Sequence, residues 1–202
     1  MKLYYKPGAC PLASHIALLE VGAAFELIEV DTDAGLTKSG QDYNKINPKG
    51  YVPALELDSG EVLTEGASIL QYIADQYPQS DLAPVSGTIE RARLHEHLNY
   101  TSSELHKAFN PFFSSVASDD DKVKAGANVA SKFDYLNTVF ADGRAYLLGD
   151  NFSVADAYMF AVSNWSSFVG IDLKKWPNVA AFVERVANRP TTQSAMKAEG
   201  LI

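Results

Sequence analysis

The chain opens with Lys2-Leu3-Tyr4-Tyr5, a short apolar stretch typical of a β-strand, and continues with Lys6-Pro7-Gly8-Ala9-Cys10-Pro11. Proline followed directly by glycine favours a turn. From Leu12 onward, apolar residues such as Ile16 and Leu19 recur at helical spacing, so a helix follows the turn. This order of strand, turn and helix places the only cysteine of the chain, Cys10, at the start of the first helix.

The position of Cys10 predicts a reactive sulfur. Proline is favoured at the first position of a helix, and Pro11 there makes Cys10 the N-cap, with its sulfur near the free amides of Leu12 and Ala13. Those amides and the positive end of the helix dipole favour a thiolate over a thiol. A lone cysteine is otherwise most often a small buried apolar residue, and that alternative stays open here.

Composition excludes several classes of protein. The 202 residues are 47% apolar and 21% charged, as in an ordinary globular protein of one large or two modest domains. A single cysteine leaves no internal disulfide, no secretory signal opens the chain, and no apolar run reaches the ~18 residues of a membrane span. We therefore expect a cytoplasmic protein that does not act at a membrane.

The net charge of −8 argues against nucleic acid as a partner, because phosphate binding needs a basic face. The acidic balance also provides no long-range attraction for a small anion. Any anion site must be built locally, from helix N-termini and a few lysines.

The chain reads as two parts. Residues 1–77 predict the order βαβαββα, with a second strand at 25–30, a short helix at about 41–46, and a hairpin formed by strands at 52–57 and 61–64. A helix then starts at Glu65-Gly66-Ala67. This pattern predicts an α/β domain with a mixed sheet and helices on its faces.

Residues 78–87 contain Pro84, Ser86 and Gly87 and predict a linker. Beyond it, residues 88–202 predict an all-helical domain, with helices at 89–109, 125–140 and 176–186 and a last short one from Arg189-Pro190. Ser153 and Asp156 form a capping box that opens a further helix.

Three segments resemble the soluble glutathione transferases and, within them, the bacterial beta class. They are residues 1–10, with their tyrosine and cysteine; residues 47–55 followed by 63–66; and residues 152–156. The resemblance covers essentially the whole chain. It implies a thioredoxin-like N-terminal domain, an all-α C-terminal domain, and a homodimer with two sites at the subunit contact. It also implies glutathione as co-substrate, with no metal.

The resemblance implies a glutathione-binding role for Val52, Pro53, Glu65 and Gly66. With a cis Val52–Pro53 bond, the backbone of Val52 can pair like an added strand with the cysteinyl backbone of the tripeptide. The amides at the helix start suit a carboxylate, and the Glu65 side chain suits an ammonium, as the γ-glutamyl end requires. The alternatives are an ordinary strand-edge proline and an acidic residue that only complements the helix dipole.

Asn99, Ser103, His106 and Asn110 form one uncharged polar stripe on the helix at 89–109, which favours a lined groove over a solvated face. In beta-class relatives, the equivalents of Asn99, Ser103, Glu104 and His106 lie at the glutathione site, some reaching it from the partner subunit. His106 could hydrogen-bond the sulfur or the thiol proton. A stripe that serves packing or capping remains the alternative.

Two further positions carry open roles. Tyr5 is a weaker catalytic candidate, because a tyrosine hydroxyl activates the thiol in other transferase classes; its alternative is packing within the strand. Gly35 stands where relatives often carry a lysine that meets the glycyl carboxylate. That contact then falls to the nearest base, Lys38, or to backbone amides.

We expect conjugation of reduced glutathione to electrophilic carbons, or reaction with peroxides, as a detoxifying activity. Cys10 and His106 would stabilise the glutathione thiolate. One alternative keeps the fold but makes Cys10 the nucleophile of thiol–disulfide exchange or reductive dehalogenation. Another is storage of hydrophobic ligands without turnover. The small electrophilic or hydrophobic substrate would enter from the helical side, beside aromatic residues that could equally be core: Phe109, Phe112, Phe113, Trp165 and Phe168.

Overall fold

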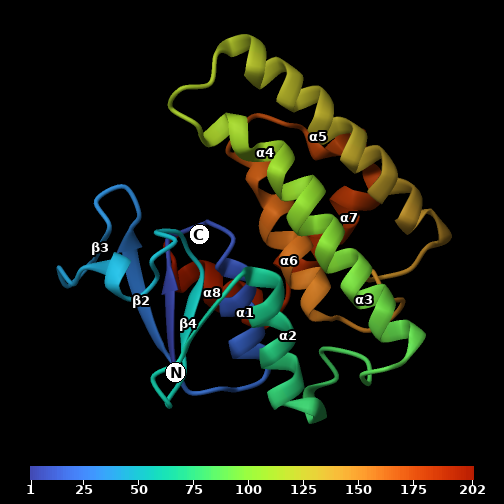
Figure 1. The fold of residues 1–202 in the computed structure, drawn as a ribbon. Coiled ribbons are helices and arrows are strands. Elements are labelled where there is room, and N and C mark those ends of the chain that lie inside the picture. The colour runs from blue at the N-terminus through green and yellow to red at the C-terminus, as the bar shows by residue number, and fades with distance from the viewer.

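A five-stranded mixed sheet forms the first part of the protein, whose residues 1–202 are all described by a computed structural model (Figure 1). The central strand β1 (Lys2–Tyr5) pairs in parallel with β2 (Glu26–Asp31) and antiparallel with β4 (Ala54–Glu56). The short strands β3 (Leu36–Thr37) and β5 (Val62–Thr64) form the two edges. The sheet order β3-β2-β1-β4-β5 brings the end of β1 next to the start of β4, so the loop after β1 lies beside the residues that precede β4.

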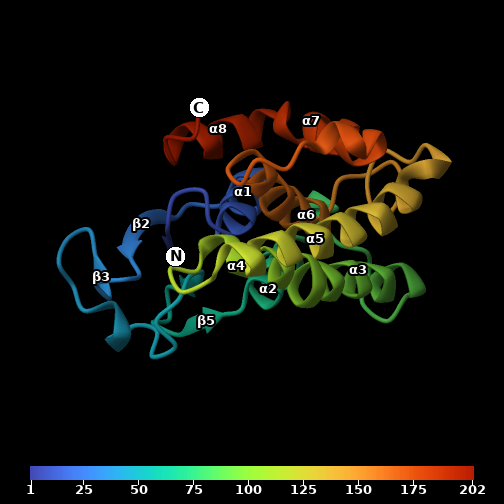
Figure 2. The ribbon, with the colours of Figure 1, turned by 90° about the horizontal axis from the view of Figure 1, so that it is seen from above.

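Two helices from the first part pack beside the sheet. Helix α1 (Leu12–Glu20) is buried along its length from Leu12 to Leu18, because it contacts the helices α6 (Val154–Ser163) and α8 (Pro190–Ala198) as well as β1. Helix α2 (Gly66–Gln76) buries its apolar side chains on one face only. Figure 2 shows α1 and α6 between two layers of helices. The upper layer contains α7 (Pro177–Ala187) and α8, and the lower layer contains α2, α3 (Ile89–Tyr100) and α4 (His106–Phe113). The core is therefore continuous between the two parts.

The second part contains only helices. Helix α3 (Ile89–Tyr100) continues through a single π-helical turn (Thr101–Leu105) into α4 (His106–Phe113). The long helix α5 (Asp119–Val139) packs beside α4, as Figure 1 shows. The remaining helices are α6 (Val154–Ser163), α7 (Pro177–Ala187) and α8 (Pro190–Ala198). No helix combines the length and the apolar character that a bilayer crossing requires.

Four local predictions differ from the structure. The helix expected at 41–46 is one 3₁₀ turn (Tyr43–Lys45), capped by the Asp42 side chain, which accepts from the Asn44 amide. The polar stretch at 31–40 contains the edge strand β3. The helix expected at 125–140 begins at Asp119, because Ser118 and Asp121 form a second capping box there. The helix expected at 89–109 runs on to Phe113 through the π turn.

The predicted capping box at Ser153 and Asp156 is confirmed, and it is buried. One Asp156 oxygen accepts from the Leu147 amide at 2.8 Å. The other accepts from the Ser153 amide at 2.9 Å and from the Ser153 hydroxyl at 2.6 Å. Burial raises the pKa of Asp156 to about 6, still below neutral pH, so these three donors face an anion. The box fixes where α6 starts.

A buried arginine joins the two parts at their linker. The Arg91 guanidinium donates to both carboxylate oxygens of Asp75, at 2.8 and 2.7 Å, and to the carbonyl of Pro84 at 3.1 Å. Bidentate arginine–carboxylate pairs fix orientation as well as distance. The end of α2, the linker and the start of α3 are thereby held in one arrangement.

Candidate functional site

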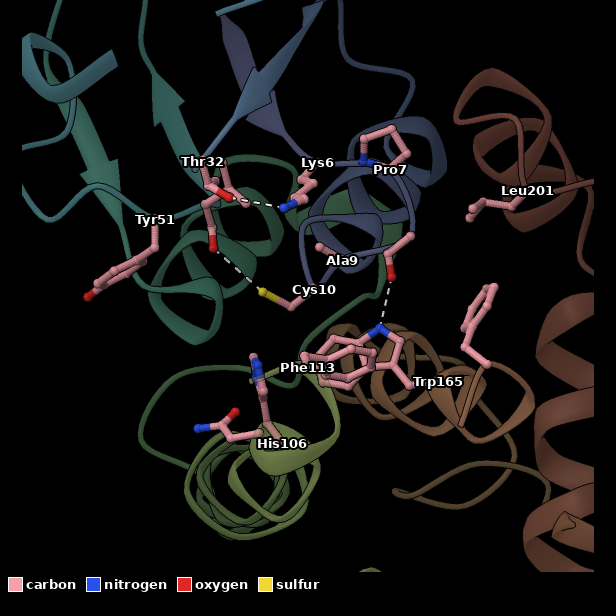
Figure 3. Close-up of a pocket in the computed structure, with 14 residues that line it drawn as sticks. Lys6, Pro7, Ala9, Cys10, Thr32, Tyr51, His106, Phe113, Trp165 and Leu201 are labelled. Carbon is pink, nitrogen blue, oxygen red and sulfur yellow. Dashed lines mark hydrogen bonds between the residues drawn. The ribbon is translucent and has the colours of Figure 1, made fainter. Parts of the chain in front are cut away.

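A cavity of about 640 Å³ lies between the loop that follows β1 and the C-terminal end of α4. We call it the main cavity; a smaller one of about 260 Å³, the side cavity, adjoins it and extends to the start of α2. The residues common to both linings are Cys10, Tyr51, Val52, His106 and Asn110. Figure 3 shows the His106 ring pointing toward Cys10 across the cavity, while the Cys10 sulfur is directed at a backbone carbonyl. The two leading candidates from the sequence therefore meet in space.

The helix start at Cys10 differs from the prediction. Pro11, not Cys10, is the N-cap of α1, and its backbone is already helical. The Leu12 amide donates to the carbonyl of Ala9 and the Ala13 amide to that of Cys10, each at 3.1 Å. The amides expected to stabilise a thiolate are therefore occupied by backbone carbonyls.

The Cys10 sulfur is a thiol at neutral pH, and the prediction of an easily ionised Cys10 is wrong. Its Sγ donates to the carbonyl of Val52 at 3.6 Å, and burial raises the pKa of the thiol to about 12. The negative charge of Glu65 acts in the same direction. Cys10 is suited to donating a hydrogen bond, not to attacking as a thiolate.

The loop before Cys10 is held by contacts that the sequence analysis did not predict. The Gly8 amide donates to Glu199 at 2.9 Å, and the Trp165 indole donates to the Gly8 carbonyl at 2.8 Å. The second oxygen of Glu199 bonds the buried His15 ring at 2.9 Å. No local pattern indicates these contacts, because Gly8 and Glu199 lie at opposite ends of the chain.

His106 is neutral and oriented. Burial, with a contribution from Lys107, lowers the pKa of its imidazole to about 4. Its Nδ1 lies 2.9 Å from the hydroxyl of Tyr158, whose own pKa burial raises far above the usual range. Tyr158 is buried and its hydroxyl has no other hydrogen-bond partner, so it donates to Nδ1. The imidazole proton then resides on Nε2.

An aromatic edge completes the support of His106. The Trp165 ring contacts the imidazole edge-on, with 4.7 Å between ring centroids. Of the five aromatic residues expected beside the substrate, Phe113, Trp165 and Phe168 line the main cavity. Phe109 belongs to the core and Phe112 packs against that core. The cavity therefore has an apolar, aromatic wall opposite Cys10.

The Val52–Pro53 peptide bond is cis, as the resemblance implied. The carbonyl of Val52 accepts from Cys10, and its amide has no partner within the chain. A backbone donor and acceptor that border a cavity just before a strand suit the addition of an extended peptide. Val52 and Pro53 both line the side cavity, and their role in glutathione binding stays a prediction.

Glu65 and Gly66 also line the side cavity, but Glu65 already has partners. One of its oxygens accepts from Lys49 at 2.5 Å and from the Tyr51 hydroxyl at 2.7 Å, which lowers the pKa of the carboxyl. Its φ of 68° is a strained value for a residue with a side chain. The amides of Gly66 and Ala67 precede the first hydrogen bonds of α2 and are free to face an anion.

Only part of the predicted polar stripe faces the cavities. His106 and Asn110 line them, whereas Asn99 and Ser103 are exposed and Ser103 donates to the Asn99 carbonyl. The His106 amide bonds the carbonyl of Thr101, five residues back, so the π turn takes up one extra residue. The row that faces the side cavity is therefore Ser102, His106 and Asn110.

Glu104 is also outside the two cavities. It forms an ion pair with Lys132 of α5 at 2.7 Å. Within this chain, Asn99, Ser103 and Glu104 do not reach the site. Their expected approach from a partner subunit stays a prediction.

Tyr5 and Lys38 lie away from the cavities. Tyr5 is only 6% exposed and lines neither of them, and burial raises the pKa of its hydroxyl. The Lys38 ammonium pairs with Glu29 at 2.8 Å. Gly35 has a φ of 69°, a left-handed conformation that glycine adopts freely and that is strained for a lysine. A Cβ there would also lie 2.6 Å from the side-chain nitrogen of the exposed Asn44, which would have to move.

The comparisons with known proteins agree over the whole chain. Residues 1–75 match the family model of the glutathione S-transferase N-terminal domain, and residues 100–190 match that of the C-terminal domain. The glutathione S-transferase GstA of Escherichia coli O157:H7 is 44% identical over 201 residues, which span all of both chains.

Two solved structures are similar at the same level. A bacterial beta class glutathione S-transferase from Sphingomonas chungbukensis has a TM-score of 0.97 at 48% identity over all of both chains. A sphingomonad glutathione S-transferase in complex with glutathione has a TM-score of 0.95 at 47% identity, again over all of both chains. The matches confirm the predicted fold class, a thioredoxin-like N-terminal domain followed by a helical C-terminal domain.

Proposed function

Because the chain belongs to the glutathione S-transferase family and is a glutathione transferase, we propose that His106 is the group that stabilises the glutathione thiolate. The observation that carries this proposal is the hydrogen bond from Tyr158, which leaves the Nε2–H of a neutral His106 as a donor beside Cys10 and Val52. A neutral donor aimed at the sulfur favours the thiolate over the thiol. The similarity to the Sphingomonas chungbukensis protein supports placement in the beta class.

The tripeptide binds as an added strand along Val52. Its cysteinyl amide and carbonyl pair with the carbonyl and amide of Val52. The γ-glutamyl carboxylate meets the free amides of Gly66 and Ala67, and the ammonium meets Glu65 in competition with Lys49. Once the peptide occupies the Val52 carbonyl, the Cys10 thiol is released from it and donates to the glutathione sulfur.

The bound thiolate attacks an electrophile held in the main cavity. Sulfur forms a bond to the electrophilic carbon, the leaving group departs with its bonding electron pair, and the thiol proton passes to solvent. Lowering the thiol pKa from the ~8.5 of a free cysteine to between about 6 and 7 raises the thiolate fraction at neutral pH roughly tenfold or more. The aromatic wall of Phe113, Trp165 and Phe168 favours flat, apolar substrates.

We propose further that the protein works as a homodimer. The exposed residues Asn99, Ser103 and Glu104 would then contribute to the site of the partner subunit, as the resemblance implies. The domain division proposed is 1–77 for glutathione binding, 78–87 for the linker, and 88–202 for the electrophile side of the site and the dimer contact. In size-exclusion chromatography, a single peak at twice the monomer mass would support the homodimer. Substitution of these residues should then shift the peak to the monomer mass.

Replacing Cys10 by alanine separates conjugation from thiol–disulfide exchange. Because Cys10 is a thiol with a pKa of about 12, we expect kcat/KM for conjugation of an aryl halide to fall by no more than about threefold, the cost of one weak hydrogen bond. Turnover of glutathione mixed disulfides measured in parallel tests the exchange mechanism. A hundredfold loss of both activities would identify Cys10 as the nucleophile and overturn the role given to His106.

Replacing Glu65 by glutamine tests the binding mode. The substitution removes the charge that faces the γ-glutamyl ammonium, so we expect the Kd for glutathione, measured by calorimetry, to rise about tenfold. Glu61 on the same hairpin is exposed and away from both cavities, and Glu61→Gln is the matched control. Equal affinity of the Glu65→Gln variant and the unaltered protein would reject this placement of the γ-glutamyl group.

A further inference from the structure

The proposed binding mode leaves one end of glutathione without a partner, and the inference that follows rests on that proposed function. The two cavities share Cys10 and Val52; the side cavity leads from them to Glu65 and Gly66, and the main cavity leads to Lys6 and Thr32. An extended peptide advances roughly 3.3–3.6 Å per residue. A tripeptide with its γ-glutamyl end at Gly66 therefore places its glycyl carboxylate beyond Val52, on the side of Lys6.

Few cations are available there. Among the residues that line the two cavities, only Lys6 and Lys107 carry a positive charge, and Lys107 lines the side cavity beside Glu65. Lys38, the expected partner of the carboxylate, is paired with Glu29. Gly35 has a φ of 69° and contributes no side chain to this end of the site. Lys6 is the remaining positive charge at the glycyl end.

The present partners of Lys6 leave it able to bind a carboxylate. Its ammonium donates to the Thr32 hydroxyl at 3.2 Å and to Asp33 at 3.4 Å. The Asp33 side chain is 91% exposed, and such an exposed ion pair contributes little. Figure 3 shows Lys6 and Thr32 side by side at the cavity wall. Because the Thr32 oxygen accepts from Lys6, its own hydrogen is free to donate to the same anion.

We propose that Lys6, assisted by the Thr32 hydroxyl, binds the glycyl carboxylate of glutathione. A charge-assisted hydrogen bond from the ammonium then replaces the weak contact with Asp33, whose side chain turns into solvent. This contact makes Lys6 the residue that distinguishes glutathione from the shorter thiol γ-glutamylcysteine, which lacks the glycyl residue. The rest of the site treats the two thiols alike.

The test compares two ligands on three single variants. Lys6→Met keeps the aliphatic stem and removes the charge; Lys45→Met is the control with the same change in net charge, at an exposed lysine outside both cavities. Lys38→Met tests the competing assignment. Calorimetry, or quenching of tryptophan fluorescence through Trp165, gives the Kd of each variant for glutathione and for γ-glutamylcysteine.

We expect Lys6→Met to raise the Kd for glutathione about tenfold and to change that for γ-glutamylcysteine less than twofold. The KM for glutathione should rise with kcat unchanged, because the contact is present equally in the ground and transition states. Thr32→Val should raise the Kd for glutathione by a smaller factor and again leave that for γ-glutamylcysteine nearly unchanged. This variant replaces Lys6→Met in the test if Lys6→Met does not fold.

Three results would overturn the inference alone: an equal loss for both ligands, no loss for either, or a loss specific for glutathione in Lys38→Met instead of Lys6→Met. Failure of the unaltered protein to bind either thiol would overturn the proposed function itself. The two failures are thus distinguished by the first titration.

Discussion

Replacing Asp156 by alanine is expected to lower the free energy of unfolding by about 3 kcal/mol. The substitution leaves the amides of Leu147 and Ser153 without their acceptor, and each buried amide left unpaired costs about 1–3 kcal/mol. The desolvation of the Asp156 anion, evident in its raised pKa, offsets part of this loss. In a chain of this length, the melting temperature should fall by roughly 6–12 °C, as measured by calorimetry at pH 7.

The second capping box provides a matched control. Asp121 makes the same contacts with Ser118 at the start of α5, but both residues are exposed. Water replaces those contacts when Asp121 is changed to alanine, so the loss should be about 1 kcal/mol. Equal losses for Asp156→Ala and Asp121→Ala would show that burial of the first box has no energetic consequence.

Replacing His106 by phenylalanine is expected to lower kcat/KM at pH 7 by about 10- to 100-fold. Phenylalanine keeps the ring that packs against Trp165 and removes the Nε2–H donor. A hydrogen bond to a charged group contributes about 1.5–3 kcal/mol, which corresponds to roughly this loss in rate. The acid limb of the pH–rate profile should shift upward by about 1–2 units, because rate rises with pH as the bound thiol ionises.

The shift in that limb identifies the mechanism. With its pKa near 4, His106 does not titrate between pH 6 and 9, so the limb reports the glutathione thiol. Tyr158→Phe keeps the imidazole but frees its tautomer, and we expect a smaller loss, about threefold. The double variant that combines His106→Phe with Tyr158→Phe leaves no Tyr158 hydroxyl without a partner. Its kcat/KM should match that of His106→Phe alone. A lower rate with an unshifted limb would assign His106 to binding or folding instead.

The sequence predicted the parts of the site that depend on local chemistry. Val52–Pro53 and Glu65-Gly66 lie at element boundaries, where proline and glycine mark the chain, and the structure brings both pairs to one cavity. The Ser153–Asp156 box is likewise a pattern of near neighbours. These residues could be predicted because their conformation depends on neighbours only a few residues away in the sequence.

Long-range contacts could not be found in the same way. The ionisation of Cys10 depends on burial beneath the helical part and on which carbonyls occupy the amides of α1. Tyr158 fixes His106 across 52 residues of chain. The proposed choice of Lys6 over Lys38 depends on the main cavity, which Lys6 lines and Lys38 does not. Each is a property of packing between segments that are distant in the chain.

The π turn between α3 and α4 gives the length of this helix a functional meaning. Each residue advances a helix by roughly 100°, so loss of the one extra residue would rotate every later side chain about the helix axis by that angle. Arg91 anchors the start of α3 to Asp75, so α3 would stay in place and α4 would rotate, with His106 at its first turn. A homologue that lacks one residue within Thr101–Leu105 is therefore expected to direct a different residue toward the thiol, even where it retains the histidine.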